Sequence, residues 1–214
     1  MTTWANNTIN KATDSVAGTS ANTDATSPQT MADDNSVGTV VWSGPDNAKT
    51  SNNVDTGNIL EIGETSHYLK ATNFGLSIPT GATINGILAE VEQAYKISGP
   101  ATENSIKIVK GGVISGDDKS TGAETTSTDT YVDYGGATEL WGETWTAEDI
   151  NLSTFGVVYS VKNLEGDAIV PQVDHIRITV YYTTAGTSAT WTNGTKNSTS
   201  FTNKDKNSTT WTND

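Results

Sequence analysis

The clearest alternation of apolar and polar positions lies between residues 68 and 97. Apolar side chains occupy every second position from Ile87 to Val91 and return at Tyr95 and Ile97, with charged residues between them. A period of two places these apolar side chains on one face of an extended strand. The preceding segment 79–81, Pro-Thr-Gly, predicts a turn, because proline fixes φ and glycine accepts positive φ. We therefore predict a long, half-buried strand that is entered through a turn.

Shorter apolar or alternating segments before and after it predict further strands. These lie at residues 38–42, 54–62, 67–71, 105–109, 130–134, 155–161 and 173–182. Turn-forming residues separate the segments, and a hairpin is expected across residues 98–104. Long polar connections at residues 110–129 and 135–154 favour a jelly-roll-like order over a meander. The chain is therefore predicted to be all-β, an antiparallel β-sandwich of about eight short strands.

The single helical signal lies between Thr144 and Leu152. Thr146 can act as the N-cap, and Asp149 stands three positions later, where its side chain can bond back to the cap residue. We therefore predict one or two helical turns in the connection that leads to the strand at residues 155–161.

The composition changes at both ends of the predicted sandwich and divides the chain into three parts. Residues 1–37 are rich in Thr, Asn, Ala, Ser and Asp, and residues 184–214 are similarly polar. Such segments bury too little apolar surface to offset their ordering entropy, which is about 1–2 kcal/mol per residue. We predict an extended N-terminal arm at residues 1–37, a sandwich domain at 38–183 and an extended C-terminal arm at 184–214.

The C-terminal arm carries an aromatic residue at every tenth position, each followed by Thr-Asn. Repeats at a fixed spacing indicate one structural unit used several times. These aromatics cannot form a core alone, so we expect them to dock on a neighbouring subunit or on the sandwich, with a flexible tail as the alternative. The N-terminal arm contains a weaker version of the same unit. The predicted assembly residues are Trp4, Trp191, Phe201 and Trp211.

Composition and charge narrow the set of partners. The chain has 12 Lys and Arg residues against 25 Asp and Glu, a formal net charge of −13, and Arg177 is its one arginine. Because binding to phosphate backbones depends on clustered Lys and Arg, we expect no nucleic acid partner. The sequence has no run of about 18 apolar residues and no basic, then apolar, leader, so we expect neither a membrane span nor a secretory signal.

Residues that could catalyse a reaction are few and scattered. The chain has no cysteine and 2 histidines, His67 and His175, each within a predicted strand. We interpret both as polar strand-face residues rather than as a catalytic base or a metal ligand. Glu90 and Glu92 share a strand face, as paired glycosidase acids can, but solvated sheets commonly present such pairs. The sequence lacks a Gly-x-Ser-x-Gly elbow, and we predict that the protein is not an enzyme.

Two other groups of residues could bind a ligand. Trp141 and Trp145 lie in a glycine-flanked loop that follows Tyr134 and could stack against a sugar ring, although packing over the end of the core is the favoured interpretation. Loop aspartates could hold a structural calcium ion, but their spacing is not that of an EF-hand. We expect no cofactor, with the calcium ion as an alternative. The aspartates are Asp117, Asp118, Asp129 and Asp133.

Several segments resemble a group of virion-associated β-sandwich proteins of tailed bacteriophages and prophage-like regions. The resemblance covers about residues 40–214 and includes the Trp-Thr-Asn decapeptides, which resemble repeats that follow some of these proteins. It implies a structural virion component that is made in the host cytoplasm and carried on the extracellular particle, and it brings no catalytic residues. The segments are 42–48 (WSGPDNA), 68–75 (YLKATNFG), 78–87 (IPTGATINGI), 134–136 (YGG), 140–142 (LWG), 144–146 (TWT), 155–157 (FGV) and 173–182 (VDHIRITVYY).

We therefore expect a non-enzymatic virion structural protein, used as a capsid decoration, a head fibre or a tail component. Its arms would join the sandwich to copies of itself and to other virion proteins. One alternative is a lectin-like module that binds a host-surface glycan through Tyr134, Trp141 and Trp145. Another is a subunit of an extracellular filament, whose arms would join like subunits in an open chain.

Overall fold

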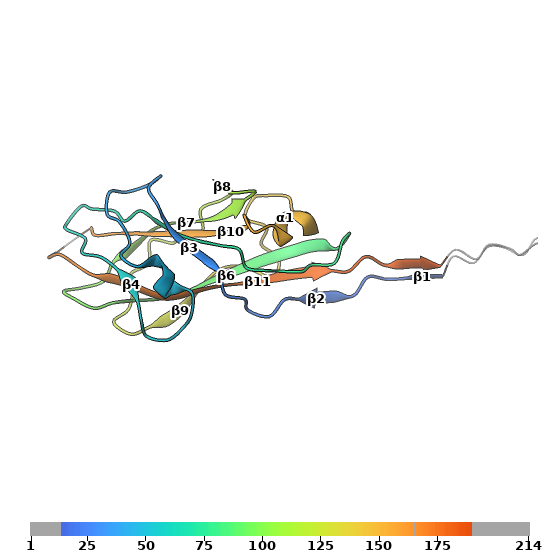
Figure 1. Cartoon of the computed structure of the whole chain (residues 1–214), viewed down its shortest axis with the longest axis horizontal. Coiled ribbons are helices and arrows are strands. Elements are labelled where there is room, and N and C mark those ends of the chain that lie inside the picture. The colour runs from blue at the N-terminus through green and yellow to red at the C-terminus, as the bar shows by residue number, and fades with distance from the viewer. Residues whose placement is uncertain (1–13, 165, 190–214) are drawn as a thin grey trace, which may run out of the picture. The chain divides into compact units, whose positions relative to one another are not determined.

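The computed structural model describes residues 14–164 and 166–189 of the chain (Figure 1). Contacts divide the chain into two units, and the larger one comprises residues 17–187. Two described strands, β1 (Asp14–Val16) and β12 (Thr187–Ala189), pair with each other in a small sheet. The remaining strands belong to the larger unit, which is the predicted sandwich.

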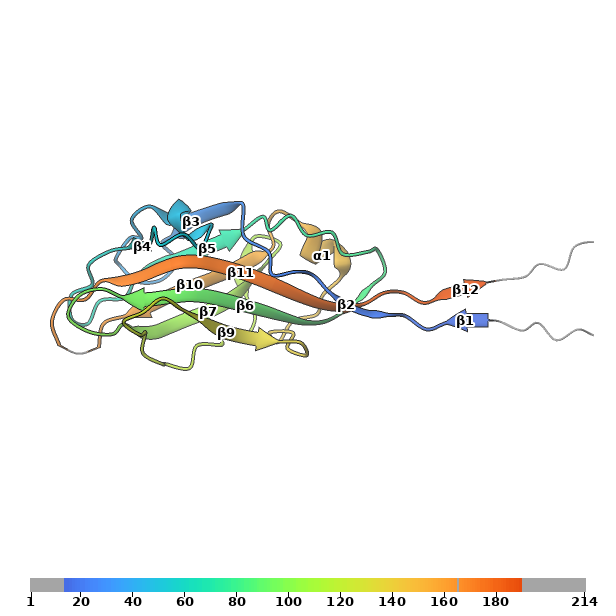
Figure 2. The same cartoon turned by 90° about the horizontal axis from the view of Figure 1, so that it is seen from below.

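The larger unit consists of two antiparallel sheets (Figures 1 and 2). One sheet has the order β3-β5-β10-β7-β8. Its strands are β3 (Thr30–Asp34), β5 (Tyr68–Thr72), β7 (Thr102–Lys110), β8 (Val113–Ser115) and β10 (Gly156–Lys162). The other sheet has the order β2-β11-β6-β9, and β4 also pairs with β11. Its strands are β2 (Ser20–Asn22), β4 (Thr56–Gly57), β6 (Thr83–Tyr95), β9 (Thr130–Gly136) and β11 (Pro171–Thr183).

Most connections pass from one sheet to the other. From β4 to β11 in chain order, the step from β7 to β8 is the one that stays within a sheet. This confirms the predicted antiparallel sandwich and is in keeping with a jelly-roll-like order. The hairpin predicted across residues 98–104 is wrong, because β6 pairs with β11 and β9 whereas β7 pairs with β10 and β8. The alternation of apolar and polar residues is the same whether two consecutive strands pair in one sheet or lie in facing sheets, so it does not identify a hairpin.

The sandwich begins earlier in the chain than the sequence suggested. β2 and β3 lie within the predicted arm at residues 1–37, yet they pair with β11 and β5. Met31 of β3 is buried in the core. Backbone hydrogen bonds to existing sheet edges order these short polar strands, which their composition does not reveal. The boundary predicted at residue 38 is therefore corrected to about residue 17.

The predicted helix is present as α1 (Ala147–Asn151), with the cap that the sequence suggested. The Oγ1 of Thr146 accepts a hydrogen bond from the N–H of Asp149 at 3.1 Å, and the Asp149 carboxylate accepts one from the N–H of Thr146 at 3.0 Å. This capping box satisfies two backbone donors that a helix N-terminus otherwise leaves without partners. Ile150 is buried and attaches the short helix to the core.

The segment between β3 and β5 is largely irregular. It contains a 3-10 helix, η1 (Pro45–Ala48), and the strand predicted at residues 54–62 is reduced to β4 and a bridge at Leu60. The buried carboxylate of Asp174 accepts three backbone N–H groups of residues 52–54, at 3.0, 3.0 and 3.1 Å. In a strand, such N–H groups bond to the backbone of a neighbouring strand. Here the Asp174 side chain accepts them instead, and this fixes the loop.

The core lies between the two sheets and follows the predicted alternation. Ile87, Ala89 and Val91 of β6 are fully buried in it. Both faces of β10 are buried, in keeping with its central place in its sheet. A second, smaller cluster forms on the other face of β10. Its buried members are Tyr68, Val109 and Val158.

The outer face of the β6–β11 pair is partly covered, which the sequence did not suggest. Glu90 and His175 were expected on a solvated polar face, yet they are only 9% and 6% exposed. The chain between β2 and β3 crosses this face, where Thr26 bridges to Ile178 and the Ser27 hydroxyl lies 2.9 Å from Nε2 of His175. Burial lowers the pKa of the His175 imidazole. The covering segment is itself polar, and Glu90 is bonded by Arg177, whereas Oε2 of Glu92 is buried without a partner among the described residues.

Candidate functional site

Trp141, predicted as part of a sugar platform, lies at the end of the sandwich where β6 begins. Its side chain is fully buried, and its Nε1 donates a hydrogen bond to the carbonyl oxygen of Ile87 at 2.9 Å. Gly135 has φ +83°, and a Cβ at this position would come within 2.7 Å of Nε1 of Trp141. A ring with no exposed face cannot stack on a sugar from solvent, so Trp141 packs the end of the core, the interpretation favoured from the sequence.

Trp145 covers the same end and is half-buried. Its Nε1 donates a hydrogen bond to the carbonyl oxygen of Leu140 at 3.0 Å, and its ring stands edge-on to Phe155 at a centroid distance of 5.5 Å. Lys110 Nζ lies 5.2 Å from the centroid of the Trp145 ring. These neighbours hold the ring over the core, and they leave little of its face for a ligand.

Tyr134 takes part in a buried network that joins the two sheets. Its hydroxyl donates a hydrogen bond to Oε1 of Glu103 at 2.5 Å, and Glu103 on β7 is only 2% exposed. The other carboxylate oxygen of Glu103 accepts the N–H and the hydroxyl of Thr121 at 2.9 and 3.0 Å. Burial raises the pKa of Tyr134 far above its ordinary value, so the phenol remains a donor. Of the three aromatics predicted as a ligand platform, Trp141 and Tyr134 are therefore buried, and Trp145 is partly exposed.

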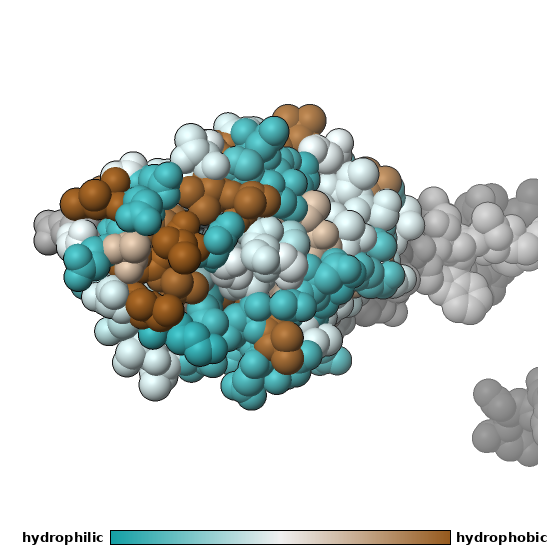
Figure 3. All heavy atoms as spheres, turned by 60° about the vertical axis from the view of Figure 1, so that its left-hand side comes forward, coloured by the Kyte–Doolittle hydropathy of each residue, from teal (hydrophilic) through white to brown (hydrophobic). Residues whose placement is uncertain are grey.

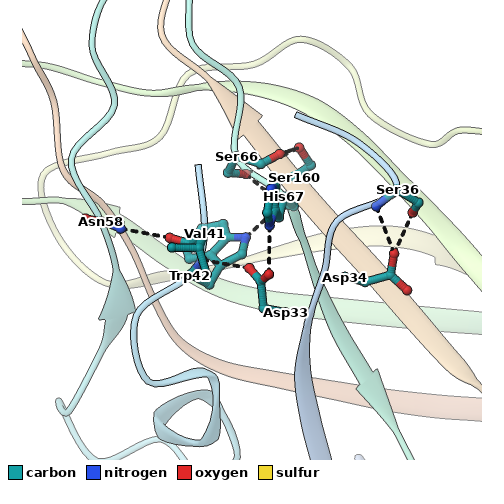
Figure 4. Close-up of polar contacts among 9 residues, drawn as sticks. All are labelled: Asp33, Asp34, Ser36, Val41, Trp42, Asn58, Ser66, His67 and Ser160. Carbon is teal, nitrogen blue, oxygen red and sulfur yellow. Dashed lines mark hydrogen bonds and ion pairs between the residues drawn. The ribbon is translucent and has the colours of Figure 1, made fainter. Parts of the chain in front are cut away.

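Asp33 of β3 connects β5 to the irregular segment before η1 (Figure 4). Its carboxylate accepts a hydrogen bond from Nδ1 of His67 at 2.7 Å and another from the N–H of Trp42 at 2.8 Å. Trp42 Nε1 donates to the carbonyl oxygen of His67 at 2.8 Å. Aspartate also orients histidine in hydrolase triads, but the hydroxyl of Ser66 is engaged with Ser160 and with the carbonyl of His67. These hydrogen bonds therefore hold the edge strand β3 against the segments around Trp42 and His67.

At the other end of β6 the chain forms an open pocket of about 450 Å³. Four segments meet there because of the strand pairing. The end of β6 lies beside the start of β11, with Tyr95 opposite Pro171. The start of β9 pairs with β6 from the other side, and β4 pairs with β11. The residues that line the pocket include Asn53, Asp55, Tyr95, Lys96, Asp129 and Gln172.

Asp55 is the most enclosed acid of the pocket, with 11% of its side chain exposed. Its Oδ2 accepts a hydrogen bond from Nε2 of Gln172 at 2.7 Å and lies 3.9 Å from Nζ of Lys96. Its Oδ1 is buried and has no hydrogen-bond partner among residues 14–164 and 166–189. A buried acceptor without a partner destabilises the fold by about 1–3 kcal/mol, so Asp55 is held in the pocket wall at a cost to stability.

Two carboxylates of the pocket hold their protons more tightly than usual. Burial, followed by the charges of Asp129 and Asp174, raises the pKa of Asp55. Burial, followed by the charges of Asp174 and Glu92, raises the pKa of Asp129. Lys96 opposes both shifts. The pocket therefore concentrates negative charge that one lysine balances only in part.

Sequence reasoning did not find this pocket, because its residues belong to four separate segments, two of which include the ends of β6 and β11. Each of these segments lies at one end of a strand, and this position is the local feature by which the sequence could have indicated them. Pairing of β6 with β11 brings Tyr95 and Gln172 together, but that pairing could not be read from the alternation. A turn is recognised locally, whereas a pocket made of several turns needs the strand order.

Large apolar side chains are exposed in the loops at the same end of the sandwich. Figure 3 shows apolar residues gathered on the end of the molecule turned towards the viewer. Individual exposed fractions range from 52% to 61%. Contiguous exposed apolar surface commonly marks an interaction site. The residues are Val54, Ile59, Ile62, Ile97 and Leu164.

The aspartates considered for calcium do not come together. Asp118 accepts the N–H groups of Ile106 and Ser120, both at 3.0 Å, and Asp117 lies 3.3 Å from Lys119 Nζ. In the described part of the chain, no three His, Cys, Asp or Glu residues are placed to hold a metal ion. Asp117 and Asp118 therefore have structural partners of their own.

The predicted assembly residues Trp4, Trp191, Phe201 and Trp211 lie outside the described residues. The sandwich shows where the flanking segments depart from it. Ser20 pairs with Thr183 at the edge of the sheet, and the N–H of Thr184 donates to the carbonyl oxygen of Thr19 at 2.9 Å. The first and last strands of the sandwich are therefore neighbours.

None of the helices in the described ranges is long and apolar enough to cross a membrane.

No model of a known protein family matches the sequence, and no curated protein matches it. Two solved structures match part of the chain at a low TM-score. One is a crystal structure of domains CD of another protein, with 16% identity and a TM-score of 0.34, covering 76% of this chain and 65% of that one. The other is a crystal structure with xylogluco-oligosaccharide, with 17% identity and a TM-score of 0.34, covering 78% of this chain and 36% of that one. This chain thus spans less than two thirds of either.

Proposed function

We propose that the protein is a non-enzymatic structural protein of a virion, a capsid decoration, head fibre or tail component, that is anchored through its terminal segments. The observation that carries the proposal is the pairing of β2, the edge strand of its sheet, with the C-terminal end of β11. Both flanking segments leave the sandwich from adjacent points, so an anchor made of both would leave the loops at the other end of β6 free. The resemblance of the sequence to virion-associated sandwich proteins supports the same role.

The aromatic repeat gives such an anchor enough surface to bind. An aromatic side chain buries about 150–250 Å² when it is enclosed. The predicted assembly residues Trp4, Trp191, Phe201 and Trp211 would together supply roughly the 800 Å² that each partner contributes to a standard interface. The partners would be copies of the chain or other virion proteins.

The first test is mass spectrometry with copy-number determination on density-banded particles from the source culture. We expect the protein in the particles, in many copies for a decoration or repeated tail element and in few copies for a fibre. Absence of the protein from the particles would overturn the proposal.

The second test changes the anchor alone in the full chain. The triple variant Trp191→Ser, Phe201→Ser, Trp211→Ser should be lost from the particles, because the aromatic area is removed. The matched control is Thr192→Ser, Thr202→Ser, Thr212→Ser, which alters the adjacent residue of each repeat and should be incorporated normally. Equal incorporation of both variants would contradict anchoring through these aromatics.

A further inference from the structure

We propose that the open pocket at the end of β6 binds a saccharide, with the hydroxyl groups of the ligand held by Asp55, Asp129 and Gln172. This site differs from the aromatic residues predicted from the sequence and goes beyond the proposed virion role. It lies at the end of β6 away from the Trp141 packing.

The first argument is the mixture of donors and acceptors in the lining. Asp55 and Asp129 offer carboxylate oxygens, whereas Lys96, Gln172 and Asn53 offer N–H donors. A sugar hydroxyl both donates and accepts, so vicinal hydroxyls match alternating partners of this kind. Donor and acceptor already stand side by side in this lining, since Oδ2 of Asp55 lies 2.7 Å from Nε2 of Gln172 and 3.9 Å from Nζ of Lys96.

The second argument is the apolar surface beside these polar groups. Tyr95 lines the pocket and is partly exposed. Val54 and Ile97, 52% and 55% exposed, adjoin lining residues in the chain. A pyranose ring presents C–H faces as well as hydroxyl edges, and aromatic or aliphatic side chains cover such faces. The volume of about 450 Å³ falls within the usual range of small-molecule sites.

The third argument separates a saccharide from a metal ion. A calcium ion requires oxygen ligands converging on one point, typically six to eight of them. Among residues 14–164 and 166–189, no three acidic or histidine groups are placed for this. Lys96 also lies within 3.9 Å of Asp55, where its charge would oppose a bound cation. Donors next to acceptors favour a neutral, hydroxyl-rich ligand.

The experiment is an NMR titration of the full ¹⁵N-labelled chain with the methyl glycosides of glucose, galactose, mannose and N-acetylglucosamine. We expect at least one glycoside to shift the amide signals of residues 94–96 and 127–129 in a saturable manner. Asp129→Ala should weaken this binding about tenfold, the factor that corresponds to one hydrogen bond to a charged group. Tyr95→Ala should weaken it through loss of the apolar wall.

The controls keep the result independent of folding. Asp133→Ala removes an exposed carboxylate further along β9, and Tyr181→Ala removes a partly exposed tyrosine on β11; both should bind like the parent chain. Loss of binding in the controls as well, or no saturable shift with any of the glycosides, would overturn the proposal. Shifts of the same signals with calcium chloride alone would overturn it in favour of a cation site. Because purified protein is used, failure here leaves incorporation into particles unaffected.

Discussion

The two ends of strand β6 differ in almost every physical respect. At its start, near Ile87, the buried indole of Trp141 fills the space above Gly135. At its end, near Tyr95, the pocket is open and lined by charged and amide groups. The two points are about 26 Å apart along the strand. One end is closed by aromatic packing, and the other carries acids that repel one another.

This difference indicates that one end of β6 stabilises the fold and that the other end carries the pocket. The closed end gains free energy from buried aromatic area and from hydrogen bonds to the indole N–H groups. The open end contributes unfavourable free energy to folding, since burial and neighbouring charges raise the pKa of Asp55 and Asp129. Groups that are unfavourable for folding but point into a pocket are characteristic of functional sites. Substitutions at the two ends should therefore change stability with opposite signs.

The largest effect is expected from Trp141→Ala at the closed end. It removes a fully buried ring and the hydrogen bond to the Ile87 carbonyl, and it should lower the free energy of unfolding by about 3–5 kcal/mol. Trp145→Ala, at a half-buried ring, should cost about 2 kcal/mol. Urea unfolding followed by circular dichroism measures both. A larger loss for Trp145 than for Trp141 would contradict the assignment of Trp141 as the main packing residue.

A smaller loss of stability is expected at Tyr134, which lies between the two ends of β6. Tyr134→Phe keeps the ring but removes the donor to Glu103, a carboxylate that is 2% exposed. The resulting unpaired buried oxygen should lower the free energy of unfolding by about 1–3 kcal/mol. Tyr181→Phe on β11, where the side chain is partly exposed, serves as the control and should stay within about 0.5 kcal/mol of the parent. Equal values for the two variants would show that the Glu103 network does not stabilise the fold.

The closed end could be predicted from the sequence to a large extent, and the open end could not. Alternation in β6 identified the buried face of Ile87 and Val91, and the Thr146 cap identified α1, because both signals are local. Packing of Trp141 was the favoured interpretation for the same reason. The pocket depends on which strands are neighbours, and the hairpin expected across residues 98–104 shows that alternation does not decide this. The polar strands β2 and β3 were missed because backbone pairing, not apolar content, orders them.

The smallest effect, and the one of opposite sign, is expected at the open end from Asp129→Asn. The substitution keeps the size of the side chain and removes a negative charge that burial, Asp174 and Glu92 disfavour. We expect the free energy of unfolding to rise by about 0.5 kcal/mol at pH 7. Asp133→Asn, at an exposed aspartate of β9 that does not line the pocket, changes the net charge equally and corrects for the general effect of the overall charge of −13.

The effect of Asp129→Asn on the free energy of unfolding should depend on pH. The pKa of Asp129 in the folded protein lies above its ordinary value of 3.8, so between the two values the folded state binds more protons than the unfolded chain. Stability therefore falls as the pH rises through that window, and the cost of the charge is fully present above it. The gain from Asp129→Asn should accordingly be largest near neutral pH and should vanish well below pH 3.8, where the carboxyl is protonated in both states. A gain that persisted there, or that Asp133→Asn reproduced, would mean that the open end carries no specific electrostatic cost and would remove the contrast between the two ends of β6.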